Sequence, residues 1–179
     1  TVPCISKIFF EDNDNHTIKG FDAVHLKLVN DGVELWLGEV KFYKDISAAI
    51  ADVVKELEQH LGDNYLKREF AAIKRKISAT HPLSDTVKQL LHQNTSLDTI
   101  IKRVVVPVLL TYDSAALSAH DVSDDAYREA ISAEFGKHHS TFSSKALPAT
   151  VRVQLVLVPL NTKDKFASIF DAKLKGLMV

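Results

Sequence analysis

The chain has 179 residues, 46% of them hydrophobic and 25% charged, with a formal net charge of −1. This length fits one globular domain, residues 1–179, and the charge excludes a protein that is basic over its whole surface. The sequence contains no apolar run of about 18 residues, so we expect no membrane span. Its one cysteine, Cys4, allows no intramolecular disulfide, which together with the lack of a signal-peptide pattern indicates the cytoplasm.

Charge is distributed unevenly along the chain. Residues 1–64 contain 6 Lys and Arg against 12 Asp and Glu, whereas residues 65–103 contain 8 against 3. Residues 104–179 contain 8 of each. The middle of the chain is therefore locally basic. It either contacts phosphate groups or forms an ordinary solvated helix surface, and the sequence leaves both interpretations open.

Strands are expected first. The segment 4–10, CISKIFF, has the pattern of a strand, and a polar loop, 11–20, follows it. Because the chain begins at Thr1, so close to this strand and without an initiator Met, we expect a further N-terminal segment in the full protein. Residues 21–29 and 33–43 form two more strands, joined at an Asn-Asp-Gly turn.

Helical periodicity begins at Asp45 and continues to Leu61, where Gly62 ends the helix. The remaining predicted helices are 64–79, 84–92 with Ser84 as N-cap, 123–137 with Ser123 as N-cap, and a last one from an Asn161 or Thr162 cap to Leu177. The remaining predicted strands are 103–112 and 151–160. Pro107 places the first of these strands at a sheet edge or a bulge. The order of elements predicts an α/β fold with a central mixed β-sheet flanked by helices.

Charged residues interrupt the two strands of the Asn-Asp-Gly hairpin. Glu39 and Lys41 lie two residues apart, so their side chains share one face of their strand. If Asp31 and Gly32 form a two-residue loop, Asp22 pairs with Lys41, and its Cβ atom lies roughly 6–8 Å from that of Glu39. A three-residue loop would instead move Asp22 to the opposite face.

Two interpretations of these charges remain open. In the first, Asp22 and Lys41 form a salt bridge, although a buried ion pair is weak evidence for a contribution to stability. In the second, Asp22, Glu39 and the carbonyl of Val40 bind Mg²⁺, which prefers oxygen ligands. Lys41 would then orient the attacking water, help to deprotonate it, or stabilise the negatively charged phosphate.

The pattern of Asp22, a hairpin and then Glu39-Val40-Lys41 resembles the motif of the PD-(D/E)xK nuclease superfamily, with Phe21 at the proline position. The stretches GFDAV and WLGEVKFY resemble the nuclease subunit of the Hachiman bacterial anti-phage defence system, over roughly residues 3–61. This resemblance implies a restriction-endonuclease-like core in which Asp22 and Glu39 bind metal and Lys41 is the catalytic lysine. It also implies a Mg²⁺-dependent deoxyribonuclease, in which Mn²⁺ can substitute, controlled by a helicase-like partner protein.

Positively charged residues nearby are candidates for contact with DNA, although each is also typical of a solvated surface. They are Lys44, Lys67, Arg68, Lys74, Arg75 and Lys76. His25 falls on the face opposite Asp22, where we expect a core or interface histidine rather than a ligand. Gln59 and Tyr65 follow the motif, but their spacing matches no pattern of the superfamily that we recognise.

Two alternatives to the Hachiman nuclease remain at this point. The first is a nuclease-like interaction subunit with a silent site, and the second is a restriction-type or junction-type nuclease outside the Hachiman group. Many superfamily members have a further glutamate on a helix before the first core strand, and this sequence has no such helix between Thr1 and its first strand. The silent subunit is therefore a hypothesis to be tested beside the active enzyme.

Overall fold

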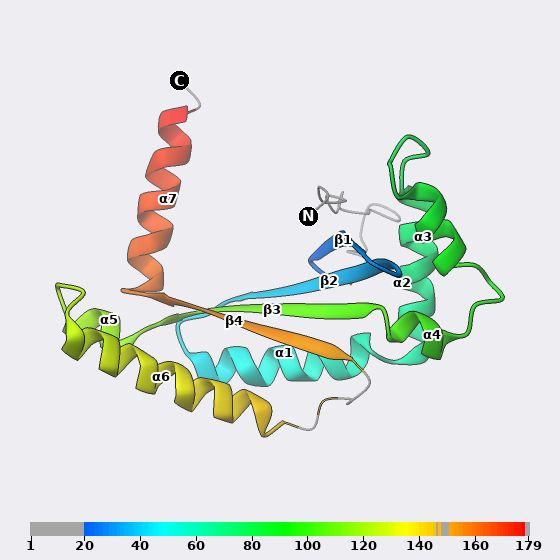
Figure 1. Cartoon of the computed structure of the whole chain (residues 1–179). Helices are drawn as coiled ribbons and strands as arrows, with labels where there is room; N and C mark the ends of the chain where they lie inside the picture. Colours follow the sequence, from blue (N-terminus) through cyan, green and yellow to red (C-terminus); the bar gives the residue numbers. More distant parts are fainter. Residues whose placement is uncertain (1–19, 146, 148–150, 178–179) are drawn as a thin grey trace. The chain divides into compact units, whose positions relative to one another are not determined.

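A computed structural model describes residues 20–145, 147 and 151–177. The strands are β1 (Ala23–Val29), β2 (Gly32–Phe42), β3 (Val104–Asp113) and β4 (Arg152–Leu160). The helices are α1 (Ile46–His60), α2 (Asp63–Lys76), α3 (Ser84–Leu90), α4 (Leu97–Ile101), α5 (Ala115–Ala119), α6 (Asp125–Ser143) and α7 (Lys163–Leu177). This confirms the predicted α/β fold (Figure 1). The strand predicted at 4–10 lies outside the described residues.

The four strands form one sheet in the order β1-β2-β3-β4, so β2 is an internal strand, as its apolar sequence predicts (Figure 1). β1 and β2 pair as an antiparallel hairpin. Leu35 N donates to the Arg103 carbonyl, and Asp113 N donates to the Lys44 carbonyl, each at 2.9 Å. Because the residue numbers rise together along β2 and β3, these two strands run parallel, and the sheet is mixed as predicted.

The turn of the hairpin differs from the predicted one. Val29 pairs with Gly32, so the two loop residues are Asn30 and Asp31 rather than Asp31 and Gly32. Gly32 has φ of 138°, a backbone conformation that residues with a Cβ atom rarely adopt. Gly32 therefore allows this unusual backbone conformation directly after the loop, and not within it.

This change of turn moves the register by two residues. Ala23 pairs with Gly38, whereas the predicted turn would have paired it with Val40. The pairing begins at Ala23, and Asp22 lies in a bend just before it. Side chains alternate between the faces of a strand, so a shift by an even number leaves every side chain on its predicted face. The predicted pairing is therefore wrong, and because Asp22 lies outside the paired residues, its shared face with Glu39 stays a prediction.

Pro107 was predicted at a sheet edge or a bulge, and the edge position is wrong because β3 is internal. Proline removes one backbone donor, which is worth about 0.5–1.5 kcal/mol as a net hydrogen bond. Burying each large apolar side chain contributes about 1.5–3 kcal/mol. β3 buries Val104, Val105, Val106, Val108 and Leu110. The burial of this apolar surface outweighs the missing donor and places the strand inside the sheet.

Helix α1 follows β2 directly and confirms the predicted helical period. Its N-cap is Asp45, whose Oδ1 accepts a hydrogen bond from Ala48 N at 2.6 Å. The apolar stripe is buried at Ala49, Ile50, Val53 and Leu57. The helix ends at His60, and Gly62, which was predicted to stop it, stands at the N-cap position of α2 with φ of −69°.

The described residues divide into two compact units. The first consists of 20–39, 55–108, 147 and 151–154. In it, α2, α3 and α4 lie together (Figure 1), and α2 buries Leu66, Phe70 and Ile73. Helix α4 was not predicted, because its five residues are too few to show a period.

The second unit consists of 40–54, 109–145 and 155–177. Helix α6 was predicted to begin at a Ser123 cap and to end at Lys137. Its N-cap is instead Asp124, whose Oδ1 accepts from Tyr127 N at 2.8 Å, and the helix continues to Ser143. Both residues are good N-caps, so the sequence alone does not distinguish them.

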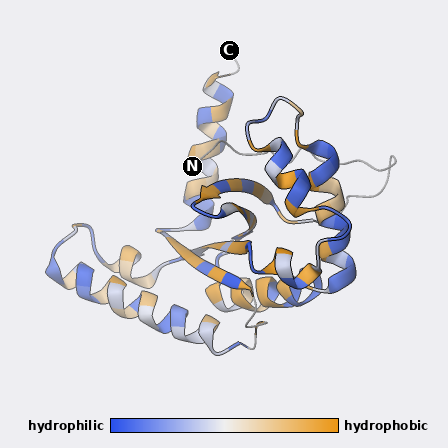
Figure 2. Ribbon diagram, turned by 45° about the vertical axis from the view of Figure 1, so that its right-hand side comes forward, coloured by the Kyte–Doolittle hydropathy of each residue, from blue (hydrophilic) through white to orange (hydrophobic). Residues whose placement is uncertain are grey.

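Helix α7 begins after Thr162, whose Oγ1 accepts from Lys165 N at 3.2 Å, in agreement with the prediction. None of its residues is buried. Hydrophobic residues nevertheless recur along it (Figure 2), and the exposed ones are Phe166, Ile169, Phe170, Leu174 and Leu177. In the part of the chain that the structure describes, this and every other helix is too short or too polar to cross a membrane.

Candidate acidic site on strand β2

Glu39 is the most deeply buried acid among the described residues, with only 1% of its surface exposed. It continues the inward face of β2 that begins with Leu35 and Leu37, both fully buried. Burial raises the pKa of Glu39, and the charges of Asp22 and Glu56 raise it further, while His60 acts in the opposite direction. A carboxyl group held in this way is unusual for a purely structural position, because burying a charge is costly.

His60 is the hydrogen-bonding partner of Glu39. Its Nδ1 lies 2.7 Å from Oε1 of Glu39, and the histidine is itself only 6% exposed. It is the last residue of α1, the helix that follows the motif strand. The helix therefore returns a polar side chain to the inward face of the strand that precedes it.

Two aromatic rings surround His60. The ring of Tyr65 stacks on the imidazole, with centroids 4.3 Å apart and an interplanar angle of 15°. Phe21, which is fully buried, meets the imidazole edge-on at 5.3 Å. Phe21 thus occupies the proline position of the motif and contributes to the core beside Glu39. Burial also raises the pKa of the Tyr65 phenol, so this side chain stays neutral at physiological pH.

Asp22 lies between buried Phe21 and the start of β1, and its side chain is exposed. It lies one residue before Ala23, which pairs with Gly38, and its charge contributes to the raised pKa of Glu39. The structure therefore brings together the two carboxylates that the sequence singled out. One of them is buried and the other faces solvent, so a ligand approaching from solvent meets Asp22 first.

Lys41 lies two residues beyond Glu39 on β2. Its Nζ is 3.5 Å from Oδ2 of Asp52, a residue of α1. The same carboxylate oxygen accepts a hydrogen bond from the Tyr43 hydroxyl at 2.9 Å. The cross-strand position opposite Lys41 is not Asp22, so the register gives no support to the predicted salt bridge between them.

The oxygen donors near Glu39 fit a hard cation in type. Among the described residues, no group of three or more His, Cys, Asp or Glu side chains is arranged to hold a metal ion. The candidate ligands are therefore two carboxylates, Asp22 and Glu39, with the carbonyl of Val40. Mg²⁺ is commonly bound through one or two carboxylates, with water and phosphate oxygens as its other ligands, so these donors are of the type that would hold it.

The candidate DNA contacts fall into two groups. Five of them lie on α2, where Lys74 is half-buried and the other four are exposed: Lys67, Arg68, Arg75 and Lys76. Arg68 also lies over the ring of Tyr65, at 5.8 Å from its centroid. Lys44, in contrast, forms an ion pair with Asp164 at 2.6 Å, which raises its pKa and offsets its charge. The α2 residues are therefore the stronger candidates.

Strand β2 carries a second buried acid, Glu34, which is 9% exposed. Its Oε1 is 2.6 Å from Nη2 of Arg152, and its Oε2 accepts from the Trp36 indole at 3.0 Å. The hydrogen bond from Arg152 lowers the pKa of Glu34. His25 is exposed and pairs with Trp36 across the hairpin, on the face away from Glu39, as predicted.

Sequence reasoning missed His60 and Glu56. His60 stands 21 residues after Glu39, and no short motif joins the two. A signal was nevertheless present, because position 60 follows Leu57 by three residues and so continues the buried stripe of α1. A histidine on the core face of the helix after the motif strand is therefore the feature that could have been recognised.

Comparison with known proteins identifies one family. The family model named HamA matches residues 1–174. No curated protein and no solved structure shows significant similarity to the chain. The match favours the Hachiman group over the restriction-type and junction-type alternatives. The chain belongs to the HamA family, a component of the multi-protein Hachiman anti-phage defence system.

Proposed function

We propose that the chain is the nuclease of its Hachiman system, a metal-dependent deoxyribonuclease that hydrolyses phosphodiester bonds. One observation carries this proposal: Glu39 is almost fully buried, and its pKa is raised by that burial and by the nearby charge of Asp22. Carboxyl groups whose pKa values are shifted by burial and by a nearby charge gather at functional sites, because there the cost in stability is offset by a role in chemistry. Membership of an anti-phage defence family supports nucleic acid as the target.

The proposal gives each motif residue one role. Asp22 and Glu39, with the Val40 carbonyl, hold Mg²⁺ or Mn²⁺. A cation held there would supply Lewis-acid chemistry for the phosphate and for the attacking water. Lys41 lies on the same side of β2 as Glu39, because side chains two residues apart share a face. Its ammonium group stabilises the negative charge that develops on the phosphate oxygens and orients the attacking water.

DNA is held by the basic residues of α2 in this proposal, with Arg68 and Tyr65 nearest to the acidic site. Contacts of this kind are electrostatic and independent of sequence, so the binding they give weakens as salt rises. The family's system has more than one protein, and we propose that a helicase-like partner controls the access of DNA to the site. The chain's net charge of −1 is consistent with a partner that supplies much of the DNA affinity.

The test is cleavage of plasmid DNA with Mg²⁺ or Mn²⁺ by the full chain, alone and with its co-encoded partner. Glu39→Gln removes the anionic ligand and should abolish cutting. Glu34→Gln alters the other buried acid of β2 and serves as the matched control, which should still cut. Cutting that persists in Glu39→Gln at the wild-type rate would show that another site, or a contaminant, is responsible.

A second candidate function is a silent, nuclease-like interaction subunit. The arrangement around Glu39 favours it in one respect, since no three-ligand metal group exists among the described residues. If the subunit is silent, the wild type and the Glu39→Gln variant should protect cells from phage equally well. Plaque counts with the two proteins therefore separate the two functions, because the nuclease proposal requires that the variant loses protection.

A further inference from the structure

The hydrogen bond between His60 and Glu39 has no role in the chemistry proposed above. It is nevertheless short, at 2.7 Å, and both residues are buried, at 6% and 1% exposure. Oε1 of Glu39 therefore has a fixed partner inside the protein. A carboxylate that has only to be ionised does not need such a partner, whereas one that must point in a defined direction does.

The imidazole of His60 is itself held in one orientation. Tyr65 lies parallel to one face of the ring at 4.3 Å, and Phe21 packs its edge at 65° to the ring plane. Phe21 and Tyr65 also contact each other, with centroids 6.2 Å apart. Because rotation of the imidazole would break both contacts, its Nδ1 stays directed at Glu39.

Phe21, His60 and Tyr65 come from separate segments that meet at the imidazole of His60, which contacts Glu39. Phe21 immediately precedes Asp22, His60 ends α1, and Tyr65 stands in the first turn of α2. Phe21, at the proline position of the motif, therefore packs against His60, which contacts Glu39. In this way a chain of contacts runs from Phe21, beside Asp22 in the sequence, through His60 to Glu39.

We infer that His60 is a positioning residue for Glu39, in which Nδ1–H donates to Oε1 while Phe21 and Tyr65 clamp the ring. The inference rests on the proposed function, since it assigns His60 to the same site. His60 is not proposed to touch the metal or the DNA. Partners that orient metal-binding carboxylates typically change metal affinity or activity by about 10–100-fold when they are lost.

Two variants separate the donor from the ring. His60→Phe keeps an aromatic ring for Phe21 and Tyr65 but removes the N–H group. His60→Asn removes the ring but keeps an amide nitrogen at the δ position, where it can donate to Glu39. His25→Phe, a change at the exposed histidine on the other face of the hairpin, is the matched control.

The measurement is binding of Mn²⁺ alone to each full-length variant by titration calorimetry, with the cleavage rate as a second readout. We expect His60→Phe to bind Mn²⁺ about 10–100-fold more weakly than the wild type. We expect His60→Asn to recover most of that affinity and His25→Phe to match the wild type. Thermal unfolding of each variant confirms that it is folded. If His60→Phe does not fold, Tyr65→Leu replaces it, with Tyr65→Phe as its control, and only the former should weaken binding.

The outcomes distinguish this inference from the proposed function. Wild-type affinity in folded His60→Phe would overturn the positioning role and leave the nuclease proposal intact. A loss of affinity in His60→Asn as large as that in His60→Phe would also overturn it, because keeping the donor would then recover nothing. If the wild type binds no Mn²⁺ and behaves as Glu39→Gln does, the metal site itself is wrong, and the positioning role fails with it.

Discussion

Two glutamates of β2, Glu34 and Glu39, face opposite sides of the strand and are both nearly buried, at 9% and 1% exposure. Arg152 and Trp36 donate hydrogen bonds to Glu34, and the pKa of Glu34 is lowered, chiefly by Arg152. Glu39 contacts His60, and burial raises its pKa. The same residue type on one strand thus meets two opposite electrostatic environments.

The difference indicates which acid serves the fold and which serves a function. A carboxylate paired with a guanidinium is favoured in its ionised form by the folded protein, so Glu34 contributes to stability at neutral pH. Glu39 is disfavoured in its ionised form, so its presence lowers stability at neutral pH. Residues of the second kind persist where activity requires them, at a cost in stability.

Replacement of Lys41, on the Glu39 side of β2, should have the largest effect on the cleavage rate. Lys41→Met keeps the aliphatic stem but removes the ammonium group, and we expect the cleavage rate to fall by about 10²–10³-fold, as for the loss of one group that stabilises transition-state charge. Lys27→Met, on the Glu34 side of the hairpin, is the control and should cut normally. A single-turnover rate in Lys41→Met equal to that of the wild type would remove Lys41 from the mechanism.

Arg152 provides the corresponding test on the structural side. Arg152→Met leaves Glu34 nearly buried without its cation, which should lower the free energy of unfolding by about 1 kcal/mol. The loss of stability is small because the Arg152 side chain is itself largely exposed. Urea denaturation measures the change in the free energy of unfolding, and the cleavage rate per folded molecule should equal that of the wild type. A large loss of activity in folded Arg152→Met would contradict the division between the two acids.

The pH dependence of stability should differ in sign between the two glutamates. For Glu34, whose pKa is lowered from 4.5, the stabilisation is present above about pH 4.5 and is lost as pH falls through the folded-state pKa. For Glu39, whose pKa is raised from 4.5, the penalty is absent below about pH 4.5 and develops as pH rises through the folded-state pKa. Glu39→Gln should therefore be more stable than the wild type at pH 8, and this advantage should vanish at pH 4. Urea denaturation at both pH values measures it, and an advantage that is larger at pH 4 would contradict the sign.

Much of the site could be predicted because alternation along a strand is a strong local rule. The apolar face of β2 and the position of Glu39 on it follow from the sequence spacing alone. The register did not follow, because Asn30-Asp31 and Asp31-Gly32 are both acceptable two-residue loops. Because the two loops differ by an even number of residues in register, the error leaves the alternation of faces along β2 unchanged.

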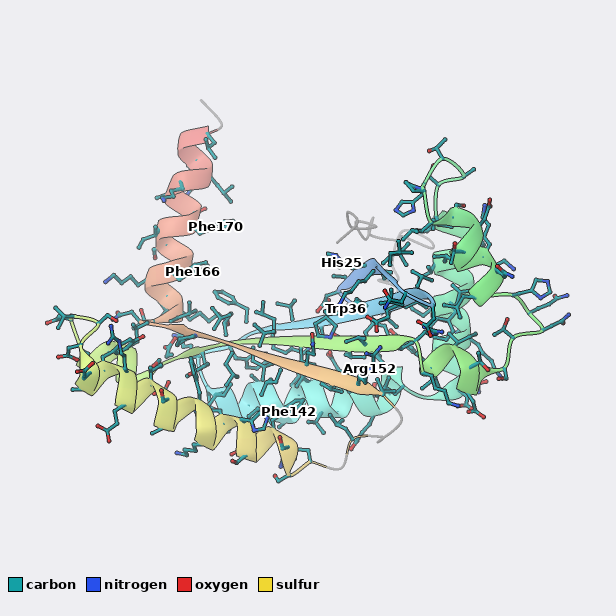
Figure 3. All side chains as sticks on the ribbon, viewed as in Figure 1. His25, Trp36, Phe142, Arg152, Phe166 and Phe170 are labelled. Carbon is teal, nitrogen blue, oxygen red and sulfur yellow. The ribbon has the colours of Figure 1, made fainter. Side chains whose placement is uncertain are left out.

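The parts that could not be predicted depend on contacts between distant residues. His60 reaches Glu39 through the length and direction of α1, which no local pattern fixes. The internal place of Pro107 depends on competition between strands for the centre of the sheet. The exposed apolar stripe of α7, with Phe166 and Phe170 stacked at 6.3 Å (Figure 3), shows the same limit. Its period predicts a helix but does not say what the helix packs against.

The most direct test of the account compares Glu39→Gln with Glu34→Gln in Mn²⁺ binding and in plasmid cleavage, with the co-encoded partner present. The account predicts that Glu39→Gln is folded, binds Mn²⁺ poorly and does not cut, whereas Glu34→Gln is less stable but binds and cuts like the wild type. Cleavage by Glu39→Gln at the wild-type rate, or equal loss in both folded variants, would contradict the assignment of Glu39 to the catalytic site.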